Sequence, residues 1–173
     1  MIKIILAASL LLGANLWAGL IEDGVSKARK GENVEALKLF ERACLRESTA
    51  QGCFFSGQAY AKGSIVEKDL KKAFDFFSKS CDLGYTDGCM VVGSDYYYGR
   101  EVKKDYVKAR EIFSKACEQG DANGCFLLGS VYDLGQGVPR NIEKAKKLYS
   151  EACDYGSEMA CKYTKQLSHD GVK

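Results

Sequence analysis

The stretch AFDFFSKSCDLGYTDGCMVVGSDY, residues 73–96, recurs 36 residues later as AREIFSKACEQGDANGCFLLGSVY, residues 109–132. Self-similarity at a period of about 20 to 50 residues is typical of solenoids, whose small units bury their apolar faces against their neighbours. The eight cysteines form four matched pairs, and the last three pairs keep the 36-residue period. The sequence therefore predicts a repeat protein. The pairs are Cys44/Cys53, Cys81/Cys89, Cys117/Cys125 and Cys153/Cys161.

The first signature in each repeat is Ala-x-x-x-Phe/Tyr-x-x-Ala/Ser-Cys, as in Ala109, Phe113, Ala116 and Cys117. Positions i, i+4, i+7 and i+8 form one stripe of an α-helix, with small residues where helices approach and an aromatic ring that fills the gap. A polar residue stands four positions before the key alanine, where its side-chain oxygen can accept from the first free amides of the helix. We therefore expect N-caps at Asp69, Asp105 and Asn141.

The second signature, Cys-x-x-x-Gly-x-x-Tyr, is also a helical stripe, and it begins at Cys53, Cys89 and Cys125. Glycine inside a helix costs about 1 kcal/mol relative to alanine, so its regular return indicates that a neighbouring helix passes too close for a side chain. A loop that starts with glycine then ends each helix. The packing glycines are Gly57, Gly93 and Gly129, and the loop glycines are Gly63, Gly99 and Gly135.

These patterns predict an all-α fold, a right-handed α/α solenoid of stacked antiparallel helix pairs stapled by disulfides. We expect a single repeat domain over residues 19–173. Its parts are an opening repeat at about 20–49, full repeats at 50–85, 86–121 and 122–157, and a closing helix at 158–170.

Residues 1–18 are predicted to be a secretory signal peptide, cleaved near Ala18. Lys3 precedes an apolar run that reaches about Leu12, which is short of the roughly 18 to 20 residues of a membrane anchor. No later stretch is long and apolar enough to cross a bilayer, so we expect a secreted or periplasmic protein without a membrane span.

An even number of cysteines in regular pairs on an exported chain predicts disulfides, formed within each pair. A metal site is the weaker alternative, because the gaps are longer than Cys-x-x-Cys and His169 is the only histidine. We expect no metal and no cofactor. The net charge of +2 is too small to favour nucleic acid, and the lysines stand beside acidic residues, as on solvated helix faces.

The sequence also resembles a known family. Leu128-Gly129-x-x-Tyr132 followed by Ala145-x-x-x-Tyr149-x-x-Ala152 is similar to the tetratricopeptide pattern, and the 36-residue period resembles its Sel-one-like variant. With the paired cysteines, nearly the whole chain after the leader resembles the secreted Helicobacter cysteine-rich proteins. It departs from them by one extra residue in the first cysteine pair, and residues 20–30 lack the Cys and Tyr.

Members of that family are described as penicillin-binding proteins or β-lactamases, so the resemblance implies an enzymatic alternative. A serine β-lactamase needs Ser-x-x-Lys, Ser-Asp-Asn and Lys-Thr-Gly motifs, and none occurs here. Ser94-Asp95 is followed by Tyr96, and catalytic residues therefore stay unknown. Because a β-lactam mimics the terminal D-Ala-D-Ala of a wall peptide, a peptide-binding groove could bind penicillin without hydrolysing it.

In tetratricopeptide-like superhelices the first helix of each repeat lines a concave groove, and the resemblance carries this role over by position. Two hypotheses follow: a monomeric exported scaffold that binds a peptide, a peptidoglycan-derived fragment or a protein, or a β-lactamase or penicillin-binding hydrolase. Polar groups between Tyr and Met suit such a ligand. The predicted groove residues are Gln58, Lys62, Asp87, Met90, Ser94, Tyr97, Tyr98, Asn123, Ser130 and Asp133.

Overall fold

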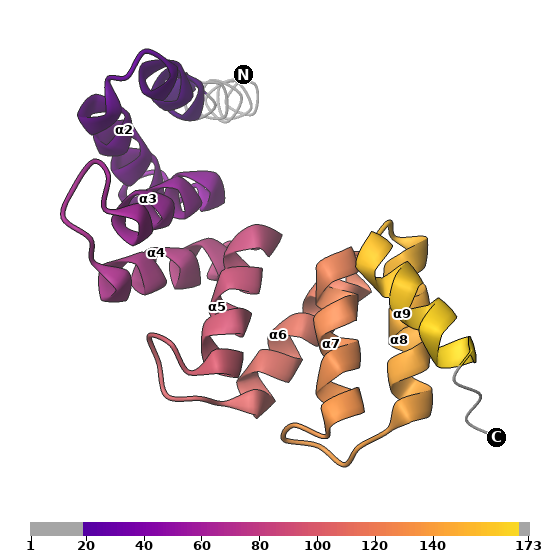
Figure 1. Ribbon diagram of the computed structural model, residues 1–173. Coiled ribbons are helices and arrows are strands. Elements are labelled where there is room, and N and C mark those ends of the chain that lie inside the picture. The colour runs from indigo at the N-terminus through magenta and orange to yellow at the C-terminus, as the bar shows by residue number, and fades with distance from the viewer. Residues whose placement is uncertain (1–18, 170–173) are drawn as a thin grey trace, which may run out of the picture. The chain divides into compact units, whose positions relative to one another are not determined.

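The computed structural model of the chain describes residues 19–169, and the predicted signal peptide lies outside them. All regular elements in this range are helices, which confirms the all-α prediction (Figure 1). None of these helices has the length and apolar character needed to cross a bilayer. Residues 19–29 are helical and are followed by α2 (Asn33–Leu45), α3 (Ala50–Lys62), α4 (Leu70–Asp82), α5 (Thr86–Tyr98), α6 (Tyr106–Glu118), α7 (Ala122–Leu134), α8 (Ile142–Asp154) and α9 (Glu158–His169).

The contacts divide the chain into two compact units, of which the first ends at Gly88 and the second begins at Cys89. In the first unit, α3 packs against both α2 and α4 (Figure 1). In the second unit, α7 packs against α6 and α8, and α8 packs against α9. The expectation of a single domain over residues 19–173 concerns the arrangement of these units and stays a prediction.

Local capping explains where the helices begin and end. The Asp69 carboxylate accepts from the Lys72 amide, and the Asp105 and Asn141 side chains cap α6 and α8 in the same way. This confirms the three predicted N-caps. Gly63 and Gly135 end α3 and α7 with φ of 67° and 65°, in the left-handed region that favours glycine.

The glycines inside the helices mark close helix contacts, as predicted. A Cβ atom on Gly57 would lie 2.8 Å from the Phe77 ring, and one on Gly129 would lie 2.7 Å from the Tyr149 ring. Both distances are shorter than real Cβ contacts, so the aromatic ring of one helix lies directly on the backbone of the previous helix. The alanine and aromatic positions of the first signature therefore form the core, and Ala109 and Phe113 are fully buried.

Disulfides join consecutive helices across their short turns. Cys44 bonds to Cys53, Cys117 to Cys125 and Cys153 to Cys161. Cys81 and Cys89 are disulfide-bonded as well, and no cysteine is free. Each of the three bonds named closes a loop of eight or nine residues, so it restricts the angle between two neighbouring helices and leaves the rest of the chain unconstrained.

Candidate functional site

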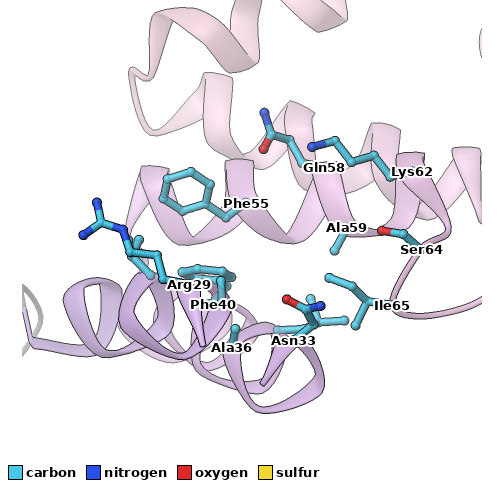
Figure 2. Close-up of a pocket in the computed structure, with 13 residues that line it drawn as sticks. Arg29, Asn33, Ala36, Phe40, Phe55, Gln58, Ala59, Lys62, Ser64 and Ile65 are labelled. Carbon is cyan, nitrogen blue, oxygen red and sulfur yellow. The ribbon is translucent and has the colours of Figure 1, made fainter. Parts of the chain in front are cut away.

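A cavity of about 450 Å³ lies over α2 in the first unit, and we call it the α2 hollow (Figure 2). Its walls come from the helical residues 19–29 and from α3, and the loop that follows α3 closes one end. Thirteen residues line it. They are Val25, Ala28, Arg29, Asn33, Ala36, Leu37, Phe40, Phe55, Gln58, Ala59, Lys62, Ser64 and Ile65.

The floor of the α2 hollow is apolar. Ala36 and Ala59 are buried, and the Phe40 ring contacts the Phe55 ring with centroids 4.9 Å apart. On its other side Phe40 lies against Gly24, where an added Cβ would lie 2.5 Å from the ring. The floor is therefore held by the same glycine and aromatic contact that builds the core of the full repeats.

The rim of the hollow is polar and carries positive charge. Figure 2 shows Gln58 and Lys62 together on α3, with Arg29 on the facing helix. Asn33 and Ser64 add an amide and a hydroxyl, and the lining residues include two cations and no carboxylate. An apolar floor under donor groups suits an apolar side chain whose neighbouring groups are carbonyls or carboxylates.

Two of the ten predicted groove residues, Gln58 and Lys62, line this hollow. Sequence reasoning missed the other members, among them Phe55, Asn33 and Ile65. The chain does offer one signal for them. The connection between the first helix and α2 spans only residues 30–32, whereas the connection between α3 and α4 spans residues 63–69. This shorter connection distinguishes the first helix pair from the full repeats.

The predicted groove residues on α5 have different surroundings. Asp87 and Tyr98 are exposed, Ser94 is half-buried, and Met90 packs against the core of the second unit. Tyr97 is only 8% exposed, because its ring packs against the rings of α6, and burial raises its pKa. This corrects the assignment of Tyr97 to an open groove.

The predicted residues on α7 are also divided. Asn123 is exposed. The Asp133 carboxylate pairs with the Arg140 guanidinium at 3.4 Å, so its charge is already compensated. Ser130 accepts a hydrogen bond from the Tyr149 hydroxyl at 3.3 Å and donates to the Phe126 carbonyl at 3.2 Å. Ser130 therefore serves the packing of α7 on α8.

Aromatic rings surround Tyr149, and we call Phe126, Tyr149 and Tyr163 the α8 aromatic cluster. Their ring centroids lie 5.3 to 5.6 Å apart. Tyr149 is 2% exposed, and burial raises its pKa while the hydrogen bond with Ser130 opposes the shift. At this position in the second unit the side chains fill the space over the helix.

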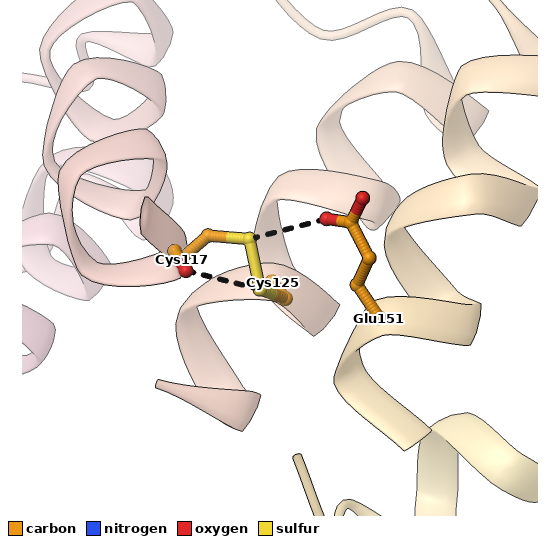
Figure 3. Close-up of side chains that lie close together, drawn as sticks. All are labelled: Cys117, Cys125 and Glu151. Carbon is orange, nitrogen blue, oxygen red and sulfur yellow. Dashed lines mark hydrogen bonds between the residues drawn. A yellow bond between two sulfur atoms is a disulfide. The ribbon is translucent and has the colours of Figure 1, made fainter. Parts of the chain in front are cut away.

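A third feature joins the Cys117–Cys125 disulfide to a carboxylate of α8 (Figure 3). The Cys117 sulfur lies 3.9 Å from Glu151 Oε2, and the two sulfurs and the carboxylate oxygen lie within 4.8 Å of one another. Three such donors suit a metal only when the cysteines are thiolates. Both sulfurs are held in the disulfide, so the oxidised protein offers no thiolate ligand here.

The sequence matches the Sel1 repeat family at residues 7–48, 50–85, 86–121 and 122–157. None of the curated proteins matches the chain. Among solved structures it is similar to a Sel1 repeat protein from Oxalobacter formigenes, with 26% identity, a TM-score of 0.79 and 87% of this chain covered. It also resembles a protective antigen of uropathogenic Escherichia coli with an SLR fold, with 24% identity, a TM-score of 0.82 and 90% covered.

A third similar structure is Helicobacter pylori cysteine rich protein B, which is 34% identical with a TM-score of 0.54. That comparison covers 66% of this chain and 96% of the other. The present chain spans only 62% of the Oxalobacter protein and 34% of the Escherichia coli antigen. The similarity therefore establishes the helical-repeat fold. It does not transfer the functions of the longer proteins to this chain.

Proposed function

This chain belongs to the Sel1 repeat family, and we propose that it is an extracytoplasmic scaffold that binds a protein partner through the α2 hollow. Sel1 repeats are helical scaffolds that typically mediate protein interactions. The partner would present an extended peptide segment, with one apolar side chain in the hollow and an acidic or carbonyl group at its rim.

The carrying observation is the α2 hollow itself. Its volume of about 450 Å³ lies within the range of about 300 to 1,000 Å³ that is usual for ligand pockets. Its floor contains Phe40 and Ala59, so an apolar side chain placed there loses contact with water. The amide of Gln58 and the ammonium group of Lys62 can then orient the peptide, because donors at a rim give specificity.

The extracytoplasmic location is supported by the cysteines. All eight are oxidised, and such bonds persist in the periplasm or outside the cell and are rare in the cytosol. The similar Helicobacter pylori protein is cysteine-rich by name. Release from the cell or retention in the periplasm would depend on the predicted leader, which lies outside the described residues.

β-Lactam hydrolysis gains no support. The matching family and the similar structures are described as repeat proteins, a protective antigen and a cysteine-rich protein. The three serine β-lactamase motifs do not occur in the sequence.

The experiment is selection of a displayed peptide library on the oxidised protein, followed by affinity measurement with the variant Gln58→Trp. The indole would occupy the rim of the hollow, so we expect selected peptides to bind about tenfold more weakly or worse. Gln51→Trp is the matched control, because Gln51 is an exposed residue of the same helix that does not line the hollow.

Peptides that bind the wild type and Gln51→Trp alike, and fail on Gln58→Trp, would support the proposal. Failure to enrich any peptide, or equal binding to all three proteins, would contradict it.

A further inference from the structure

A second cavity, of about 500 Å³, lies in the second unit where the loop after α5 meets the start of α6. We call it the α6 basic pocket. It is lined by three exposed lysines and one acidic residue, beside a tyrosine and a valine. Its lining residues are Tyr96, Val102, Lys103, Lys104, Asp105 and Lys108.

The one carboxylate of this pocket is already engaged. Asp105 Oδ1 accepts from the backbone amides of Val107 and Lys108, both at 3.1 Å, in its role as the N-cap of α6. Its other oxygen lies 3.9 Å from the Lys108 ammonium nitrogen. Within residues 19–169, neither Lys103 nor Lys104 forms an ion pair. Positive charge in the pocket therefore stays available for a ligand.

Aromatic faces place two of the ammonium groups. Lys108 Nζ lies 5.0 Å from the centroid of the Tyr96 ring, and Lys104 Nζ lies 5.6 Å from that of Tyr106. Contacts of this length are attractive because a cation interacts with the negative face of the ring. The two lysines are thus partly ordered before any ligand arrives.

The loop that carries Lys103 and Lys104 is held at both ends. At its start, the buried Asp95 carboxylate binds Arg100 Nε at 2.9 Å, and the Asp95 carbonyl accepts from the Gly99 amide at 2.8 Å. At its end, the Asp105 amide donates to the Tyr96 carbonyl at 2.9 Å.

The contact between Asp95 and Arg100 is particular to this repeat. The same helical position carries Ala59 in the preceding repeat and Val131 in the following one, and both are core residues. A buried carboxylate is costly unless it is paired, so an apolar residue would suit the core better at this position. What the carboxylate adds is one side-chain contact between α5 and the loop, made to Arg100.

Two of the corresponding cations in the other repeats contact a carboxylate. Lys72 donates to the Tyr60 hydroxyl at 2.6 Å and lies 3.8 Å from Glu41. Arg140 donates to the Asp133 carbonyl and also contacts its carboxylate. At the position of Lys103, the other two repeats have Glu67 and Pro139.

We propose that the α6 basic pocket binds a phosphate-type oxyanion, such as a phosphate monoester carried by a lipid or by a small soluble molecule. Three lysines around one hollow suit such a group, because lysine provides point charges and several donors to phosphate oxygens. This pocket lies in the second unit, apart in sequence from the α2 hollow, so the inference does not depend on the proposed function.

The first test is a titration of the oxidised protein with inorganic phosphate, in which the amide chemical shifts of residues 99–108 are measured at each step. We expect a saturable change that weakens with added salt, and a loss of at least about tenfold in affinity in the double variant Lys103→Gln/Lys104→Gln. Lys38→Gln/Lys71→Gln in the first unit makes the same change in net charge at exposed residues and should stay within about twofold of wild type. Equal losses in both double variants, or no saturation, would overturn the proposal.

A second variant separates a preorganised pocket from general attraction between opposite charges. Asp95→Val installs the residue found one repeat later, leaves all three lysines in place and removes a negative charge. General attraction predicts tighter phosphate binding by this variant. The preorganised loop predicts binding that is weaker by about threefold or more. Unchanged or tighter binding would overturn the proposal.

Vesicles identify the source of the oxyanion. Retention on vesicles of phosphatidylcholine with phosphatidic acid, and its loss in the Lys103→Gln/Lys104→Gln variant, would assign a lipid phosphate monoester. Binding of inorganic phosphate without vesicle retention would assign a soluble phosphate ester. Binding to neither, or equal retention on pure phosphatidylcholine, would overturn the assignment of a phosphate site.

Discussion

The α2 hollow and the α8 aromatic cluster are built on the same position of the repeat but differ in how they are filled. Phe40 and Tyr149 both occupy the aromatic position of the first signature, and each lies against a helical glycine. Over α8 the Phe126 and Tyr163 rings surround the aromatic residue, whereas over α2 a cavity of about 450 Å³ lies beside it. One scaffold position can therefore be enclosed in packed core or border an open cavity, according to the residues around it.

The largest expected difference comes from removing the two rings. Tyr149→Ala should lower the free energy of unfolding by about 3 to 5 kcal/mol, because the ring is fully enclosed and its loss leaves a cavity. Phe40→Ala should cost less, because that ring already borders an open cavity. Urea unfolding of the two oxidised variants measures both values, and equal losses would show that the two positions are equally well packed.

Removing one disulfide should lower the free energy of unfolding by about the same amount in either unit. The Cys44–Cys53 and Cys117–Cys125 bonds close loops of nearly equal length, with sequence separations of 9 and 8. If the bonds act mainly on the unfolded chain, replacing either pair by alanines should cost about 2 to 3 kcal/mol. Denaturant unfolding of the two double variants provides the measurement. A gap of more than about 1 kcal/mol would mean that native contacts, such as that with Glu151, contribute.

Adding one methyl group to each helical glycine tests how freely the facing ring can move. Gly129→Ala should destabilise the protein by about 1 to 2 kcal/mol, because its Cβ would meet a Tyr149 ring confined by two others. Gly24→Ala would place a Cβ 2.5 Å from the Phe40 ring, closer than the 2.7 Å at Gly129, but the Phe40 ring can shift toward the hollow, so we expect a smaller loss. Thermal unfolding of both variants shows which substitution destabilises the protein more. A larger loss for Gly24→Ala would mean that the Phe40 ring cannot shift toward the hollow.

The smallest effect concerns Asp95, which occupies in the next repeat the position that Ala59 holds in the hollow. Burial raises the pKa of Asp95 above its usual value, while the Arg100 guanidinium opposes the shift. The folded state therefore holds this proton more tightly than the unfolded chain, and the penalty develops as the pH rises from the unfolded pKa through the folded pKa. The stability of the wild type relative to Asp95→Asn should increase as the pH falls through this window.

Urea unfolding at several values from about pH 7 to about pH 4 measures this trend. A pH-independent difference for Asp95→Asn would mean that its carboxyl titrates alike in both states.

Features set by neighbouring residues were predictable from the sequence, and features set by distant ones were not. The N-caps at Asp69, Asp105 and Asn141 depend on contacts within three residues, and the structure confirms them. The contact of Gly129 with the next helix followed from a pattern that recurs three times.

The α2 hollow required knowledge of three segments at once. The prediction of Gln58 and Lys62 follows from the resemblance to tetratricopeptide-like superhelices and from their position relative to the packing glycine, but Asn33 and Ile65 approach from other parts of the chain. Tyr97 was misassigned because it stands four residues after Gly93, on the face of α5 that packs against α6. A helical stripe shows which residues share a face, and only the partner helix shows whether that face is covered.

The short reach of the disulfides has a consequence for the order in which the protein matures. Eight thiols allow roughly a hundred complete pairings, a search that could delay oxidation. Here the partners of each described bond are at most nine residues apart. If the chain meets an oxidant from its N-terminus onward, both sulfurs of one pair are available before those of the next pair emerge. Correct pairing would then follow from the order in which the cysteines reach the oxidant, with little need for disulfide exchange.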